Sequence, residues 1–106
     1  MGVRSRSRKA LLQARYAAEV NGRSLTVNLE EIDARIEESL ENWTLDRLSL
    51  VARLILEQAL GEIFYSQPPT PIPVVIDEAI ELAKAFDTDE TAGFVNGVLD
   101  TISRTG

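Results

Sequence analysis

Hydrophobic residues recur at steps of three and four along most of the chain, which is the spacing of one face of an α-helix. The clearest case runs from Leu29 to Trp43, with apolar side chains at positions 29, 32, 36, 40 and 43 and a strongly acidic opposite face. Asn28 can cap this segment, and Glu31 can complete a capping box. The pattern predicts an amphipathic helix beginning at Leu29.

The next segment, Leu45 to Phe64, is apolar around most of its circumference. A helix of this kind cannot lie on a surface, so we expect it to form the centre of the core. Thr44 is its expected N-cap, and the helix can be joined to the preceding one by only a kink.

Three further helices complete the expected fold. The first runs to Val20, is rich in Ala, Leu, Arg and Gln, and is expected to stop at Asn21-Gly22. Pro71 and Pro73 suit the first turn of a helix that ends near Phe86. We expect that helix to bury Val75, Ile76, Ala79, Ile80 and Ala83.

After a turn at residues 87–89, Thr88 or Asp89 can cap a last helix. Its expected inner face comprises Phe94, Val95, Val98, Leu99 and Ile102. Because no alternating strand pattern of useful length occurs, the predicted fold class is all-α. We expect one compact bundle of about five helices over residues 1–106.

The composition limits the kinds of catalytic and metal-binding site that the chain can form. The chain has neither His nor Cys, which excludes Ser-His-Asp and Cys-His catalysis, disulfides and zinc-thiolate sites. Adjacent acids such as Glu30-Glu31 point in different directions on a helix, and residues 87–90 lack the ligand spacing of a calcium loop. We therefore expect no enzyme, no cofactor and no metal, and favour a binding module.

The net charge of −6 is unevenly distributed. Residues 1–23 hold six basic side chains and one acid, whereas residues 24–106 hold five basic side chains and sixteen acids. A basic end on an acidic body favours nucleic acid or an acidic surface as a partner, although a solvated, flexible terminus is the alternative. The charges within residues 45–64 exclude a membrane span, and we expect a cytoplasmic protein without a membrane partner.

Two runs near the C-terminus carry a family resemblance. Residues 76–86 read IDEAIELAKAF and residues 94–100 read FVNGVLD. They resemble the C-terminal half of the bacterial NusB family, whose pattern INEAIELAKxF is matched except at Asp77. Trp43 to Ile63 is similar to the family's long core helix, with its characteristic arginine at Arg47. Residues 4–16 are similar to its arginine-rich first helix, which ends in a tyrosine.

The resemblance implies a transcription antitermination factor without catalytic activity. Such proteins bind the boxA element of nascent RNA together with NusE, a small-subunit ribosomal protein, within an RNA polymerase antitermination complex. The RNA-binding positions of the family map onto Arg4, Arg6, Arg8, Lys9 and Tyr16. The positions that contact the ribosomal protein map onto Asp46 and Glu90, with Phe94 beside them. Tyr16 and Phe94 can equally belong to the core, and the two acids can be merely solvated.

Two departures from the family leave alternatives open. The family has further helical material between its first helix and the segment that matches residues 29–42, and Arg15 stands where the family places a buried leucine. An uncovered first helix favours a partner, and helix exchange in a homodimer would supply one. The chain could then be an interaction or self-assembly module without RNA binding. A third interpretation is a fragment of an RNA methyltransferase whose N-terminal domain resembles NusB.

Overall fold

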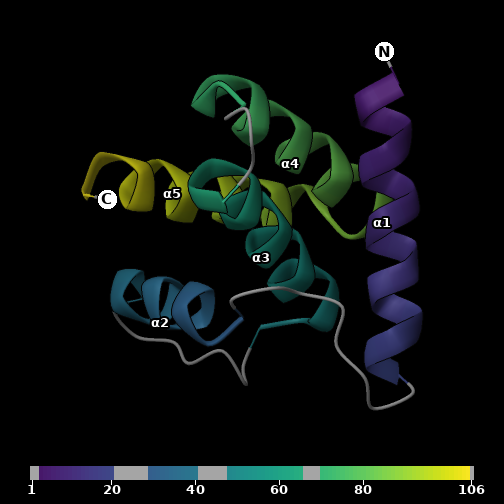
Figure 1. The fold of residues 1–106 in the computed structure, drawn as a ribbon, viewed down its shortest axis with the longest axis horizontal. Helices are drawn as coiled ribbons and strands as arrows, with labels where there is room; N and C mark the ends of the chain where they lie inside the picture. The colour runs from purple at the N-terminus through teal and green to yellow at the C-terminus, as the bar shows by residue number, and fades with distance from the viewer. Residues whose placement is uncertain (1–2, 21–28, 41–47, 66–69, 106) are drawn as a thin grey trace.

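A computed structural model describes residues 3–20, 29–40, 48–65 and 70–105, apart from the side chains of residues 3–7, 29 and 105. These ranges form five α-helices and contain no strand (Figure 1). The helices are α1 (Val3–Val20), α2 (Leu29–Ser39), α3 (Leu50–Tyr65), α4 (Ile72–Phe86) and α5 (Asp89–Thr105). The all-α prediction is confirmed.

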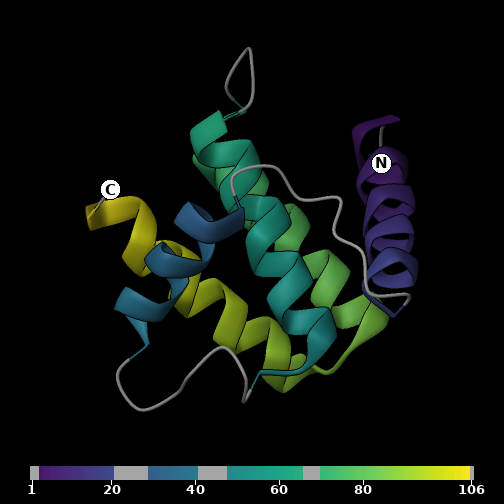
Figure 2. The same cartoon turned by 60° about the horizontal axis from the view of Figure 1, so that its bottom comes forward.

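Helix α3 is the centre of the bundle, as its apolar circumference predicts. Every residue from Leu54 to Leu60 is buried, and α3 packs against each of the other four helices. The hairpin of α4 and α5 covers one side of it (Figure 2), and α1 stands at the edge of the molecule. Residues of α1 that face away from α3, such as Ala10, Leu11, Ala14 and Ala17, are exposed.

The start of α3 differs from the prediction. The helix begins at Leu50, and its N-cap is Ser49, whose Oγ accepts the Ala52 amide at 3.0 Å. A serine hydroxyl can satisfy a first-turn amide that has no partner within the helix, which fixes the start here. The same hydroxyl donates to Asp87 Oδ2 at 2.8 Å. The expected caps Thr44 and Asn28 and the Asn21-Gly22 stop lie outside the described residues.

The other expected ends agree well with the structure. Pro71 precedes α4 and Pro73 lies in its first turn, while Thr88 Oγ1 caps α5 by accepting the Thr91 amide at 3.1 Å. Within α4, Val75, Ala79 and Ala83 are buried as predicted, Ile76 and Ile80 are half-buried, and Leu82 is an additional core residue. The final helix buries all its expected positions except Phe94, which is half-buried.

Helix α2 lies against α3 and α5 through its apolar face, with Ile32 and Ile36 fully buried. It ends at Ser39, earlier than the predicted Trp43, which lies outside the described residues. Two contacts join α2 to the end of α3: Arg35 stacks 4.1 Å from the Phe64 ring centroid, and the Tyr65 hydroxyl donates to Glu31. None of the described helices is long and apolar enough to cross a membrane.

Candidate nucleic-acid interface

The arginine-rich helix α1 docks on the bundle through a face that includes two arginines. Arg8, Leu12, Arg15 and Ala18 follow one another at steps of four and three residues, and all four are buried. The sector of α1 that contains Arg8 and Arg15 is therefore the inner face of the helix. Charged side chains at such positions require partners, because burying an unpaired charge is costly.

Arg8 finds its partner in Glu62 of α3. Its Nε donates to Glu62 Oε2 at 2.8 Å and its Nη2 donates to Glu62 Oε1 at 2.6 Å, a forked pair that fixes both position and angle. Only 6% of Arg8 is exposed, and its hydrogen bonds to Glu62 raise the pKa of its guanidinium. Gln58 Nε2 also donates to the Arg8 carbonyl at 3.1 Å. Arg8 is therefore an anchor of α1.

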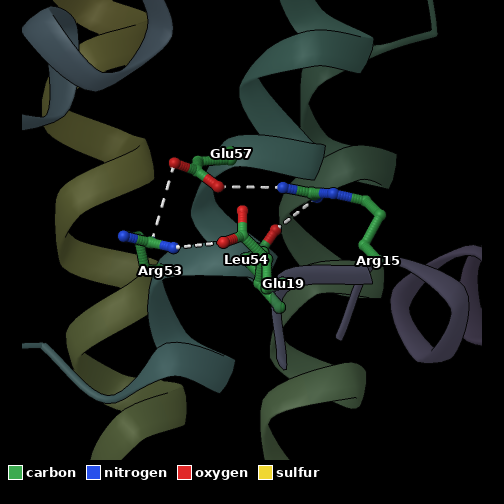
Figure 3. Close-up of polar contacts among 5 residues, drawn as sticks. All are labelled: Arg15, Glu19, Arg53, Leu54 and Glu57. Atoms are coloured by element: carbon green, nitrogen blue, oxygen red, sulfur yellow. Dashed lines mark hydrogen bonds and ion pairs between the residues drawn. The ribbon is translucent and has the colours of Figure 1, made fainter. Parts of the chain in front are cut away.

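Arg15 provides a second anchor two turns further along α1 (Figure 3). Its Nη1 donates to the Leu54 carbonyl at 2.7 Å and its Nη2 to Glu57 Oε1 at 2.9 Å. Arg15 is 3% exposed, and burial lowers its pKa despite the opposing effect of Glu57. Where the family resemblance leads us to expect a buried leucine, this chain buries a guanidinium and supplies it with polar partners.

Arg53 links the Arg15 cluster to the end of α1. Its Nη2 lies 3.2 Å from Glu19 Oε2, and its Nε lies 3.9 Å from Glu57 Oε2 (Figure 3). The pKa of Glu57 is raised to about 8, first by burial and then by hydrogen bonding and repulsion from Asp33, against the lowering effect of the two arginines. The α1–α3 contact is thus polar as well as apolar.

The remaining predicted RNA-binding residues fall into two groups. Arg4 and Arg6 lie in the first turns of α1, with side chains outside the described part. Lys9 is half-buried, whereas Tyr16 is 44% exposed. Tyr16 borders an open depression of about 440 Å³, together with Leu12, Gln13, Val51 and Phe86 from α1, α3 and α4. Tyr16 is thus a surface residue and not part of the core.

The predicted protein-binding residues Glu90 and Phe94 are brought together. Both line a second depression of about 220 Å³ at the start of α3 and α5, beside Leu48, Ser49 and Thr91. Glu90 is exposed and Phe94 is half-buried. Asp46, the third predicted residue, lies outside the described residues. In the described part of the chain, no group of three or more acidic side chains could hold a metal ion.

Sequence reasoning missed the acceptors that hold α1, namely Glu57 and Glu62, and the donor Gln58. Their signal was present, because all three interrupt an otherwise apolar helix expected at the centre of the core. A buried polar side chain implies a polar partner from another element. Arg8 and Arg15, two turns apart on α1, are the cations that pair with Glu62 and Glu57.

Comparisons with known proteins agree with the resemblance described from the sequence. The NusB family model matches residues 23–104. The transcription antitermination protein NusB of Treponema denticola is 52% identical over 75 residues, which is 71% of this chain and 54% of the relative. The protein of the same name from Pseudothermotoga lettingae is 44% identical over 98 residues, covering 92% of this chain and 68% of the relative. A match of that extent necessarily includes part of α1.

Among solved structures, T. maritima NusB matches with a TM-score of 0.68 and 47% sequence identity. The match covers 73% of this chain and 54% of that chain. This chain therefore spans between 54% and 68% of the length of these relatives.

Proposed function

The chain belongs to the NusB family, and on that premise we propose that it is an RNA-binding module of the transcription antitermination type. It binds boxA-like single-stranded RNA together with the basic ribosomal protein NusE and catalyses no reaction. The relatives named as transcription antitermination proteins support a role in antitermination. The placement of α1 supports the assignment of the RNA-binding surface to that helix.

The placement of α1 carries the proposal. The helix is anchored by its inner face through Arg8 and Arg15, so its remaining faces and its first turn are available to a ligand. We assign the RNA contacts to Arg4, Arg6, Lys9 and Tyr16, with guanidinium and ammonium groups on phosphates and the tyrosine ring available to stack on an unpaired base. Arg8 contributes by holding the helix in place.

Glu90 and Phe94 form the proposed contact for the ribosomal protein, with Asp46 as a third member. An acidic group beside a half-buried aromatic ring suits a basic partner that also brings an apolar side chain. This surface lies at the start of α3 and α5, on elements other than α1. RNA and protein can therefore be held by different elements of one small bundle.

A competing function has its own supporting observation. Leu11, Tyr16 and Val20 on α1 and Phe86 on α4 are large exposed hydrophobic residues, as expected if a further segment or a second copy covered them. The chain would then be a self-assembling module without RNA binding.

The test is a titration of labelled boxA-type RNA with the protein, with and without the ribosomal protein, while light scattering records the mass in solution. We expect RNA binding that weakens as salt is added and strengthens with the ribosomal protein. A concentration-dependent dimer with no RNA affinity in either condition would overturn the proposal in favour of self-assembly.

A further inference from the structure

A pair of buried carboxyl groups joins α2 to α3. Asp33 of α2 lies within hydrogen-bonding reach of Glu57 of α3, and Glu57 is only 1% exposed. Asp33 Oδ1 and Glu57 Oε2 are both buried, and neither receives a hydrogen bond from a donor in the described part of the chain. Two ionised carboxylates are acceptors only, so a hydrogen bond between them requires a proton on one.

The charges around Glu57 also indicate that one carboxyl group of the pair carries a proton. Glu57 interacts electrostatically with Arg15 of α1, Asp33 of α2 and Arg53 of α3, and Glu19 of α1 pairs with Arg53. Two cations thus meet three acids, so the fully ionised cluster carries one uncompensated negative charge. Excess charge in a mostly buried cluster is unfavourable, and a single bound proton makes the cluster neutral.

We propose that Asp33 and Glu57 share one proton at neutral pH, with Glu57 Oε2–H donating to Asp33 Oδ1. The other oxygen of the same group, Oε1, accepts from Arg15 at 2.9 Å. One carboxyl therefore joins three helices: through its proton to α2, through its carbonyl oxygen to α1, and through its own backbone to α3. The pKa of Glu57, raised to about 8 with burial as the largest cause, agrees with this assignment.

The shared proton makes the attachment of α2 sensitive to pH. Loss of the proton places two like charges in contact across the α2–α3 interface, which weakens that interface. The same event increases the attraction between Glu57 and Arg15, so the α1–α3 contact is strengthened. Alkaline pH should therefore loosen α2 and leave α1 docked. This inference rests on the cluster itself and is independent of RNA binding.

The proton can be located by NMR titration of the side-chain carboxyl carbons between pH 5 and pH 10. We expect Glu57 to be protonated at pH 7 and to titrate on the alkaline side. In D33N the amide can donate to Glu57 Oε2 and replace the proton, so the Glu57 midpoint should fall by roughly two pH units or more. E37Q, on the exposed side of α2, is the matched control and should leave the midpoint unchanged.

Two results would overturn the proposal: a Glu57 carboxylate already ionised at pH 5 to 7, held by Arg15 and Arg53, or an unchanged midpoint in D33N. If D33N does not fold, E57Q provides a second test, since its amide donates to Asp33 at every pH. Amides of α2 should exchange faster in the wild-type chain than in E57Q at pH 9, and equally at pH 6. Equal exchange at both pH values would contradict the shared proton.

Discussion

Arg8 of α1 and Glu62 of α3 form a forked pair of hydrogen bonds, 2.8 and 2.6 Å long, across 54 positions of sequence. The pair lies in the half of α1 that carries most of its positive charge. Arg8, which composition alone would assign to RNA binding, instead attaches α1 to the bundle. Together with Arg15, Arg8 fixes the position of α1 on the bundle.

Removing the anchor should destabilise the fold. We expect R8A to lower the free energy of unfolding by about 2 kcal/mol, because it removes two charge-assisted hydrogen bonds and leaves Glu62 without Arg8. The measurement is urea unfolding followed by circular dichroism. R104A removes an exposed pair with Asp100 four residues earlier on α5, and should cost less than about 0.5 kcal/mol. Equal losses in the two variants would contradict the anchoring role.

Arg15 and Glu57 should be energetically coupled. R15L restores the side chain expected in the family but leaves the Glu57 acceptor unmatched, and we expect a loss of roughly 3 kcal/mol. The double variant R15L/E57L should lose about 1–2 kcal/mol less than the sum of its single variants. Arg15 and Arg104 have no common partner, so the effects of R15L and R104A on the free energy of unfolding should be additive. Additivity of R15L and E57L would show that the buried pair contributes no specific interaction.

The stability of the chain should fall as pH rises toward mildly alkaline values. The pKa of Glu57 is about 8 in the fold against an ordinary value of 4.5, so between these values the folded chain holds a proton that the unfolded chain has released. The contribution of this group is fully present below pH 4.5 and is lost as pH rises to 8, with a slope of up to about 1.4 kcal/mol per pH unit.

The composition makes this dependence easy to isolate. The chain has no His and no Cys, so no side chain with an ordinary pKa titrates between pH 5.5 and 8. Unfolding free energies measured across that interval should decline in the wild-type chain and stay nearly flat in E57Q. Parallel curves for the two proteins would mean that Glu57 is not the group responsible.

The helices were predictable because each one shows its period in the sequence. The buried face of α4 and the Thr88 cap follow from hydrophobic spacing and from the chemistry of a hydroxyl before a helix. The start of α3 was not predictable in this way, because the sequence offers both Thr44 and Ser49 as caps, and the hydrogen bond from Ser49 to Asp87 joins residues 38 positions apart. Local pattern does not contain that contact.

The inner face of α1 shows a different limit. Arg8, Leu12 and Arg15 lie on one sector, and a sequence pattern assigns charged residues to solvent. Their burial depends on Glu57 and Glu62, more than 40 positions away, and single-sequence periodicity carries no information on such pairs. The exposure of Tyr16 could not be predicted for the same reason, since it depends on what covers α1.

The most direct test of the central claim, that α1 is an RNA-binding helix held by buried arginines, compares the boxA-RNA affinity of R6A/K9A with that of R104A. We expect R6A/K9A to bind at least about tenfold more weakly, with the log–log salt slope reduced in magnitude by roughly 1.4 for two lost phosphate contacts. R104A should bind as the wild type does, and both variants should remain folded. An R6A/K9A variant that is folded and binds RNA with wild-type affinity and salt dependence would contradict the account.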